Sequence, residues 1–285
     1  MRAAARHHSI SPSQNVELAV LPDIAQPIDW TPLLEEVDVV VHLAGIAHRK
    51  PGDPVDYDQA NRGAVADLAS ACLKHKVRRL IFISSIGAQA GSAADEELTE
   101  ECVPYPVNDY GRAKLAAEEA IRASGVPYVI LRPVLVYGSE PIANIALLVR
   151  LAALPIPLPF GAFHNRRSLV SRENLISAVR WCIDQPGALN ETFIVSDPQP
   201  MSLAETLAVL RRAMGRRPNL LPIPPAIFFL LAKAARKTLL WDRIGRELVA
   251  SSDKLQSRGW KPLLTTEEGL TAMVQGTGRP KLPAA

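Results

Sequence analysis

The chain has 285 residues, of which 48% are hydrophobic and 21% charged, the composition of a globular protein. The ample apolar content excludes disorder, and the widely spaced Cys72, Cys102 and Cys182 exclude a disulfide scaffold. A formal net charge of +3 is too balanced to predict nucleic-acid binding. The sequence also shows no membrane span and no signal peptide. We therefore expect a cytoplasmic protein of one large domain, or of one domain with a small lobe.

Apolar runs alternate with helical patterns along the first half of the chain. In chain order the pattern predicts strands at 16–20 and 37–43, a helix at 60–75, a strand at 79–83, a helix at 110–124 and a strand at 127–132. Helices that alternate with strands buried on both faces indicate βαβ units and an open, doubly wound parallel sheet.

Ligands bind at the carboxyl ends of the strands in such a sheet. Three polar sets follow expected strands here: residues 42–48, Ser84 with Ser85, and residues 132–139. His42 and His48 have no third ligand at a credible spacing, so we predict no metal site.

Tyr110 and Lys114 are four residues apart and therefore share one face of the expected helix. A phenol is a poor base at its ordinary pKa near 10, and a neighbouring ammonium lowers that pKa. The pair can therefore form a general acid/base near neutral pH, although the same spacing also occurs on solvated amphipathic helices. Ser84 and Ser85, about 25 residues upstream, offer hydroxyls for a substrate oxygen, or simply end their strand in a turn.

Seven segments then follow one another in a characteristic order. They are Val39–Gly45, Asn61–Gly63, Leu80–Ser85, Tyr110 with Lys114, Leu131–Gly138, Pro159–Leu175 and Arg258–Leu270. Together they resemble the extended short-chain dehydrogenase/reductases, and within them the NAD-dependent epimerase/dehydratase group that acts on nucleotide sugars. The resemblance spans roughly residues 15–270, and Ala64 stands where the family usually has Thr.

The resemblance implies a role for each matching residue. Tyr110 is the acid/base, Lys114 lowers its pKa and holds the nicotinamide ribose, and Ser85 orients the sugar hydroxyl, with Ser84 as the alternative. Arg166 and Arg167 are candidates for the substrate diphosphate, because a guanidinium binds phosphate bidentately, or else are surface arginines. The implied cofactor contacts are Arg6, Leu43, Ala44, Gly45, Asn61, Ser84, Tyr110, Lys114, Arg132 and Pro133, and the implied substrate contacts are Ser85, Asn144, Arg166 and Arg167.

The activity implied by the resemblance is hydride transfer between C4 of a hexose and the nicotinamide of NAD or NADP. We expect a 4-epimerase that acts on a UDP-hexose or UDP-N-acetylhexosamine through a transient 4-keto sugar and feeds surface polysaccharide synthesis. The alternatives are an NADPH-dependent 4-keto reductase and a truncated remnant without catalysis. The family also implies a homodimer.

The N-terminus departs from the family pattern. The family opens with a strand and a GxxGxxG turn, whereas the first glycine here is Gly45 and residues 1–7 resemble the family's second strand. We therefore expect about 30 residues to be absent, through an upstream true start, a truncation, or a partner that supplies the strand. Arg6 and the lack of an acidic residue before Glu17 favour NADP.

The predicted fold is α/β: an N-terminally truncated Rossmann-like sheet with a small C-terminal substrate lobe. We place the cofactor domain at 1–198, with 139–165 contributing to the lobe, and the lobe at 199–285. Residues 222–240 are apolar, with Lys233, Arg236 and Lys237 on the polar side. Such a pattern is more typical of a helix in the core or in a dimer interface. A helix that lies at the membrane surface would instead indicate a lipid-linked sugar as substrate.

Overall fold

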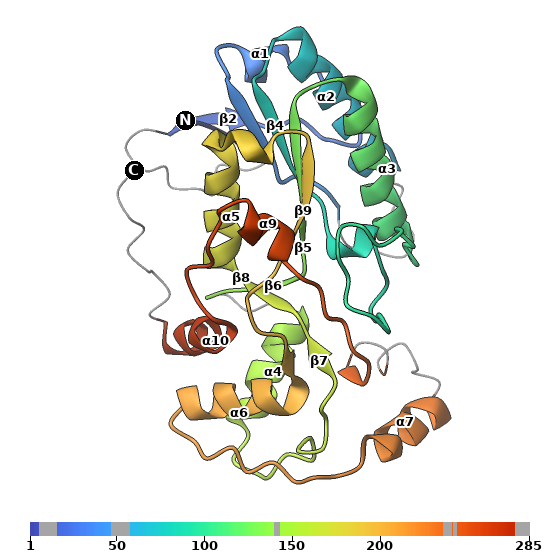
Figure 1. The fold of residues 1–285 in the computed structure, drawn as a ribbon, viewed down its shortest axis with the longest axis vertical. Helices are drawn as coiled ribbons and strands as arrows, with labels where there is room; N and C mark the ends of the chain where they lie inside the picture. Colours follow the sequence, from blue (N-terminus) through green and yellow to red (C-terminus); the bar gives the residue numbers. More distant parts are fainter. Residues whose placement is uncertain (6–15, 47–57, 140–142, 236–240, 242–243, 277–285) are drawn as a thin grey trace. The chain divides into compact units, whose positions relative to one another are not determined.

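The structure, a computed structural model, describes residues 1–5, 16–46, 58–139, 143–235, 241 and 244–276 (Figure 1). The chain packs as two compact units, each built from several segments. The first unit comprises Met1–Gln89, Pro104–Leu131 and Gln185–Thr192, and the second comprises Ala90–Val103, Arg132–Asp184 and Phe193–Ala285. These are units of packing, and the predicted domain boundary between residues 198 and 199 stays a prediction.

Parallel strands form the framework of the first unit. β1 (Arg2–Ala5) pairs in parallel with β2 (Glu17–Val20) as a two-stranded sheet. A four-stranded sheet has the order β3-β4-β5-β9, in which β4 pairs in parallel with both β3 and β5. The bounds are β3 Val39–His42, β4 Arg79–Ile83, β5 Tyr128–Pro133 and β9 Glu191–Val195, of which β5 from Arg132 and β9 from Phe193 belong to the second unit. The four strands expected from the sequence are thus confirmed as β2 to β5, and so is the α/β class.

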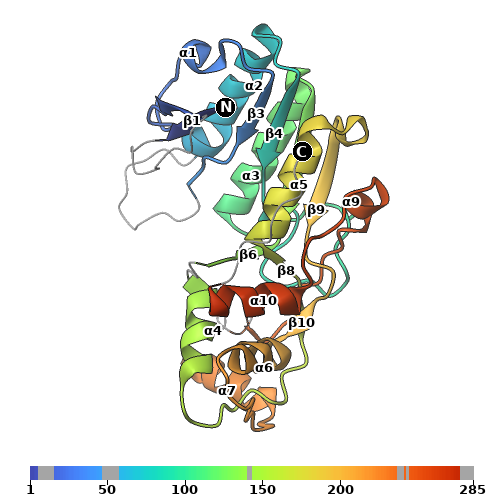
Figure 2. The ribbon, with the colours of Figure 1, turned by 90° about the vertical axis from the view of Figure 1, so that its left-hand side faces the viewer.

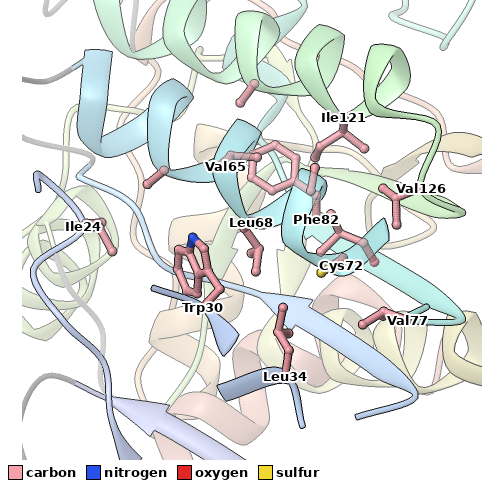
Figure 3. Packing of buried hydrophobic residues seen from close by; sticks show 14 of the residues in the cluster. Ile24, Trp30, Leu34, Val65, Leu68, Cys72, Val77, Phe82, Ile121 and Val126 are labelled. Carbon is pink, nitrogen blue, oxygen red and sulfur yellow. The ribbon is translucent and has the colours of Figure 1, made fainter. Parts of the chain in front are cut away.

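The helices of the first unit cover this sheet and close its core. The bounds are α1 Thr31–Leu34, the π-helical turn η1 Gln59–Gly63, α2 Ala64–Lys74, the 3-10 turn η2 Ile86–Ala88, α3 Asp109–Ser124 and the 3-10 turn η3 Pro186–Ala188. Leu68 of α2 and Ile121 of α3 are buried with Phe82 of β4 and with Trp30 (Figure 3). The apolar runs of β4 and β5 are buried because helices and neighbouring strands exclude water from both faces.

The second unit contains two small sheets and most of the remaining helices. β6 (Leu135–Tyr137) pairs in parallel with β8 (Leu169–Ser171), and β7 (Arg166–Arg167) pairs antiparallel with β10 (Met201–Ser202). Its helices are α4 Ala143–Ala153, α5 Arg172–Asp184, α6 Leu203–Ala213, α7 Pro225–Ala234, α9 Asp253–Ser257 and α10 Thr266–Gln275. Helix α6 packs against both α4 and α10, and Leu207, Leu210 and Leu270 are buried together there (Figure 2).

A buried carboxylate, Asp197, ties together several segments of the second unit. It accepts hydrogen bonds from the hydroxyl of Tyr137 (2.6 Å), from Nδ2 of Asn174 (2.6 Å) and from the backbone N–H of Ser171. Asn174 Oδ1 in turn accepts from the backbone N–H of Leu263, ahead of α10. Burial raises the pKa of the Asp197 carboxyl, and these hydrogen bonds oppose the rise.

We expect Asp197→Ala to destabilise the protein by about 3 kcal/mol, because three donors lose a shared buried acceptor at once and only Tyr137 and Asn174 keep a second one, in the carbonyl oxygens of Thr266 and Leu264. Urea unfolding measures the loss. Asp95→Ala is the matched control, since Asp95 is an exposed carboxylate paired with Arg246 and should cost at most about 1 kcal/mol. Equal losses in the two variants would contradict a structural role for Asp197.

Candidate active site

Ser85, Tyr110 and Lys114 lie together in the first unit. Ser85 follows the buried strand β4 and is the N-cap of η2. Its Oγ accepts a hydrogen bond from the backbone N–H of Gly87 (3.1 Å). Tyr110 lies in the first turn of α3, whose N-cap Asn108 accepts the N–H of Gly111 (2.8 Å). The side chains of Ser85 and Tyr110 are hydrogen-bonded. The structure therefore brings the predicted acid/base and the predicted sugar-orienting hydroxyl into contact.

A glycine allows this close approach between α3 and η2. A Cβ built on Gly111 would overlap the carbonyl oxygen of Gly87. A Cβ on Gly87, by contrast, would lie 3.3 Å from Ser85 Oγ and 3.8 Å from the Tyr110 ring. Gly111 is therefore the residue that lets the start of α3 come near enough for Tyr110 to contact Ser85.

We expect Gly111→Ala to push the first turn of α3 away from η2 and to lower activity about 100-fold, the usual cost of a misplacement near 1 Å. Steady-state kinetics measure the loss, and thermal melting reports the accompanying strain. Gly187→Ala is the matched control, because a Cβ at Gly187 meets no atom within 4 Å and should leave both readouts unchanged. Wild-type kinetics in Gly111→Ala would show that this approach is not required.

Lys114 is buried beneath the pair, with 4% of its surface exposed. Its Nζ donates to the carbonyl oxygen of Ile83 (3.0 Å) and lies 4.6 Å from the ring centroid of Phe82 and 6.0 Å from that of Tyr110. Burial lowers the pKa of Lys114 to about 8, while the carboxylate of Glu118 opposes the decrease.

The electrostatics of Tyr110 differ from the sequence-based expectation. A neighbouring Lys114 was expected to lower the phenol pKa, but burial raises the pKa of Tyr110, and the hydrogen bond with Ser85 is what opposes that rise. The physical reason is desolvation, which disfavours the phenolate and cannot be read from residue spacing. Tyr110 is consequently a phenol at neutral pH in the protein without cofactor.

Glu118 is a site residue that the sequence analysis missed. It is fully buried, accepts a hydrogen bond from Ser84 Oγ (2.5 Å) and forms an ion pair with Arg122 (3.0 Å). The hydroxyl of Ser84, predicted as an alternative to Ser85, is thus directed at Glu118. The available signal was the continued four-residue spacing from Tyr110 through Lys114 to Glu118, which places all three on one face of α3.

The predicted cofactor residues after β3 also lie beside Lys114. Asn61 is buried in η1, and its side chain bonds both backbone groups of Ile46, at 2.9 and 3.2 Å. A Cβ on Gly45 would lie 3.0 Å from Asn61 Oδ1 and 3.4 Å from Lys114 Nζ. Leu43, between β3 and this glycine, is 71% exposed. Arg6 lies outside the described residues.

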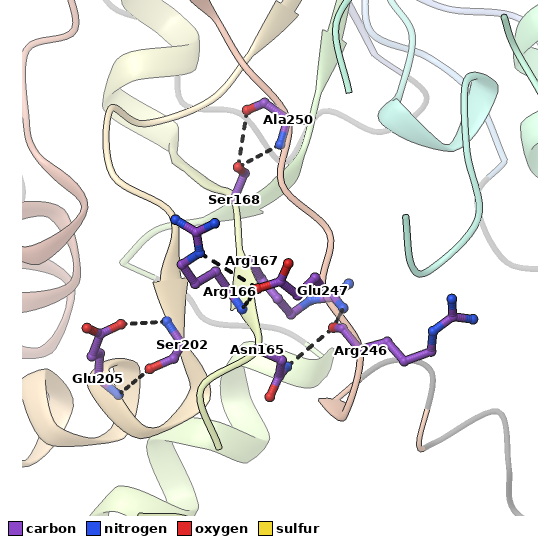
Figure 4. Close-up of polar contacts among 9 residues, drawn as sticks. All are labelled: Asn165, Arg166, Arg167, Ser168, Ser202, Glu205, Arg246, Glu247 and Ala250. Carbon is purple, nitrogen blue, oxygen red and sulfur yellow. Dashed lines mark hydrogen bonds and ion pairs between the residues drawn. The ribbon is translucent and has the colours of Figure 1, made fainter. Parts of the chain in front are cut away.

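The remaining predicted contacts belong to the second unit. Arg132 and Pro133, at the end of β5, are buried, and Asn144 at the start of α4 is exposed. Arg167 donates to the carbonyl oxygens of Arg246 (3.0 Å) and Ser92 (2.9 Å), so its guanidinium is held by backbone (Figure 4). The side chain of Arg166 is 59% exposed and lies 3.7 Å from Glu247. The substrate roles of Asn144, Arg166 and Arg167 stay predictions.

The described part of the chain offers neither a cluster of metal ligands nor a membrane-spanning helix. No group of three or more His, Cys, Asp or Glu side chains there is arranged to hold a metal ion. None of the described helices is both long and apolar enough to cross a bilayer. His42 is buried and stacked on Phe82, and burial lowers its pKa to about 4, so the imidazole is neutral next to Lys114.

The sequence of the chain is similar to those of several known proteins. The sequence profile of the NAD dependent epimerase/dehydratase family matches residues 4–195. A UDP-glucose 4-epimerase from Vibrio cholerae is 37% identical over 264 residues, which cover 89% of this chain and 80% of that protein. An N-acetyl-alpha-D-glucosaminyl-diphospho-ditrans,octacis-undecaprenol 4-epimerase from Escherichia coli O157:H7 is 23% identical and covers 91% of this chain and 83% of its own length.

Solved structures agree at the level of the fold. A UDP-N-acetylglucosamine 4-epimerase from Bacillus cereus superposes with a TM-score of 0.74 at 18% identity, over 98% of this chain and 90% of that chain. A UDP-glucuronic acid 4-epimerase from the same organism, in complex with NAD, gives 0.70 at 19% identity, over 94% and 83%. These likenesses confirm the predicted Rossmann-like architecture.

Proposed function

Because the chain belongs to the NAD-dependent epimerase/dehydratase family, we propose that it is a nucleotide-sugar 4-epimerase with NAD as cofactor and a UDP-hexose or UDP-N-acetylhexosamine as substrate. Family membership makes it an enzyme of the sugar-nucleotide epimerase type. The observation that carries the proposal is the contact between the phenol of Tyr110 and the hydroxyl of Ser85, with the ammonium of Lys114 beside them. A 4-epimerase needs one group that takes a proton from a sugar hydroxyl and gives it back, and we assign that role to Tyr110.

The residues around Lys114 fit a dinucleotide. Lys114 donates one of its three N–H groups to Ile83, which leaves donors for ribose hydroxyls. Gly45 keeps the chain after β3 free of a side chain that would press on Asn61 and Lys114. A bound NAD would supply the hydride acceptor and a positive charge, and that charge would oppose the raised pKa of Tyr110 and favour the phenolate.

The protein's own groups then perform the proton transfers. Tyr110 Oη, as phenolate, accepts the proton of the 4-hydroxyl while C4 is oxidised to a ketone, and Ser85 orients that oxygen by a hydrogen bond. The 4-keto sugar rotates and presents its opposite face for reduction. When C4 is reduced, Tyr110 returns the same proton to the oxygen on C4. In the second unit we assign the exposed guanidinium of Arg166 to the substrate diphosphate, since that of Arg167 already binds two carbonyl groups.

The test is conversion of substrate by the purified chain with NAD. Proton NMR of UDP-glucose, and separately of UDP-N-acetylglucosamine, should show the galacto epimer accumulating to equilibrium with one of them. Absence of an epimer in both, while the chain binds NAD, would overturn the proposal. Stoichiometric oxidation of NADPH by a nucleotide-linked 4-keto sugar would instead establish the reductase alternative.

We further infer a cytoplasmic homodimer. The support is family resemblance for the dimer and, for the compartment, the three cysteines without a CxxC pair. Sedimentation of the full chain tests the dimer.

A further inference from the structure

Helix α7 presents an unusually apolar outer face. None of its residues is buried, and Ile227, Leu230 and Leu231 are exposed to 48%, 62% and 62%. These residues recur at helical spacing, so they share one face. Leu221 and Phe229, at 45% and 38%, add to the exposed apolar surface near the helix. Exposed apolar surface of this extent indicates an interaction site.

The inner side of the same helix is anchored by aromatic contacts. The ring of Phe228 lies 5.5 Å from that of Phe160 and 5.2 Å from that of Phe163, and Phe229 contacts Trp241 at 5.4 Å. Figures 1 and 2 place α7 at the end of the second unit that also holds α6. The helix is therefore held by one side, and its leucines face outward in this arrangement.

The segment that contains α7 is rich in positive charge. Residues 206–241 contain no Asp or Glu and seven basic residues, which leaves −4 for the rest of a chain whose formal net charge is +3. Arg211 is buried and donates to backbone carbonyls, and Arg212 forms an ion pair with Glu267 (3.2 Å), whereas Arg216, Arg217 and Lys233 are exposed. Arg236 and Lys237 lie outside the described residues. Lys233 borders the apolar face of α7, where its ammonium can reach a charged surface beside the leucines.

We propose that α7 docks this protein on an anionic lipid surface. The leucine face would enter the boundary between headgroups and acyl chains, and the basic residues would lie against lipid phosphates. A second copy of the chain is a poorer occupant, because pairing α7 with itself would bring two acid-free, basic segments together. Docking of this kind needs no spanning helix and does not depend on the proposed epimerase activity.

Flotation of the full chain with vesicles tests the proposal without any activity assay. We expect the chain to float with vesicles of equal parts phosphatidylglycerol and phosphatidylcholine, and to remain at the bottom with phosphatidylcholine alone. Raising the salt concentration should weaken the binding, because it screens the basic residues. Equal binding to both vesicle types, or to neither, would overturn the proposal.

Two matched substitutions identify the surface. Leu230→Glu should lower partitioning to anionic vesicles about tenfold or more, since it removes an exposed leucine that would be buried in the lipid and adds a negative charge. Ile176→Glu, on an exposed apolar residue of α5 in the same unit, should leave partitioning unchanged. Unchanged thermal melting shows that both variants are folded. If Leu230→Glu floats like the wild type, or instead only converts a dimer to a monomer, α7 is not the lipid-binding surface.

Discussion

Replacing Tyr110 with Phe is expected to lower kcat for C4 epimerisation by about 10²–10⁴-fold, the range for loss of a positioned acid/base. The substitution removes only Oη, so the ring keeps its place beside Gly87 and the fold should persist. The rate falls because the neighbouring groups on this face of α3 have other roles: we assign the remaining N–H groups of Lys114 to the cofactor ribose, and Glu118 is bound to Ser84 and Arg122. Rates of epimer formation by NMR measure the effect.

Tyr105→Phe is the matched control for this prediction. Tyr105 belongs to the same unit but is 79% exposed, so losing its hydroxyl should change neither rate nor stability. NAD affinity of Tyr110→Phe, followed by cofactor fluorescence, separates a catalytic loss from a loss of binding. A Tyr110→Phe variant with near wild-type kcat would remove Tyr110 from the acid/base role.

The second large effect is expected from Glu118→Gln. The carboxylate of Glu118 holds up the pKa of Lys114 against burial, which has already lowered it to about 8. Without that charge the ammonium should be lost nearer neutral pH. If the site needs the ammonium, the basic limb of the pH profile of kcat/KM should move about one pH unit lower.

Ser84→Ala is the control, because it removes the hydrogen bond to Glu118 but keeps the carboxylate. The pH profile of kcat/KM for Ser84→Ala should match that of the wild type. A profile of Glu118→Gln that overlays the wild type would mean that Glu118 is only a structural partner of Ser84 and Arg122.

Lys114 also predicts a pH dependence of stability that needs no activity. Its pKa in the folded protein, about 8, lies below the ordinary value of 10.5, so the unfolded chain binds more protons between these values. Stability relative to Lys114→Met should therefore rise by roughly 3 kcal/mol as the pH increases through that window. The stability of Glu118→Gln, measured relative to the double variant Glu118→Gln/Lys114→Met, should begin to rise at lower pH. Urea unfolding across the pH range measures both, and a flat difference would contradict a buried, titrating Lys114.

Much of the first unit could be predicted from local sequence, for a physical reason. The runs 37–43, 79–83 and 127–132 are mostly apolar and short, which is typical of strands that are buried on both faces of a parallel sheet. The helix from 110 to 124 was predictable from its helix-forming residues and from Gly125, which adopts the positive φ of a C-terminal cap. Spacing alone also placed Tyr110 and Lys114 on one face.

Other features depend on contacts that spacing does not encode. Burial sets the direction of the Tyr110 pKa, and nothing in the sequence states how deep the phenol lies. Glu118 looked like one more polar residue of an amphipathic helix until its contact with Ser84, 34 positions earlier, became visible. The binding of Arg167 to Ser92 and Arg246 likewise joins distant segments. For α7, the apolar pattern favoured a core or interface helix, and only the exposed fractions distinguish an outward face.

Return of the hydride to the opposite face of the same carbon is tested most directly with UDP-glucose deuterated at C4. The chain, with NAD and this substrate in ordinary water, should yield the C4 epimer with its deuterium retained at C4, because the hydride never exchanges with solvent and only the hydroxyl proton passes through Tyr110. An epimer in which a hydrogen from the solvent has replaced the deuterium at C4 would contradict the proposed 4-keto route.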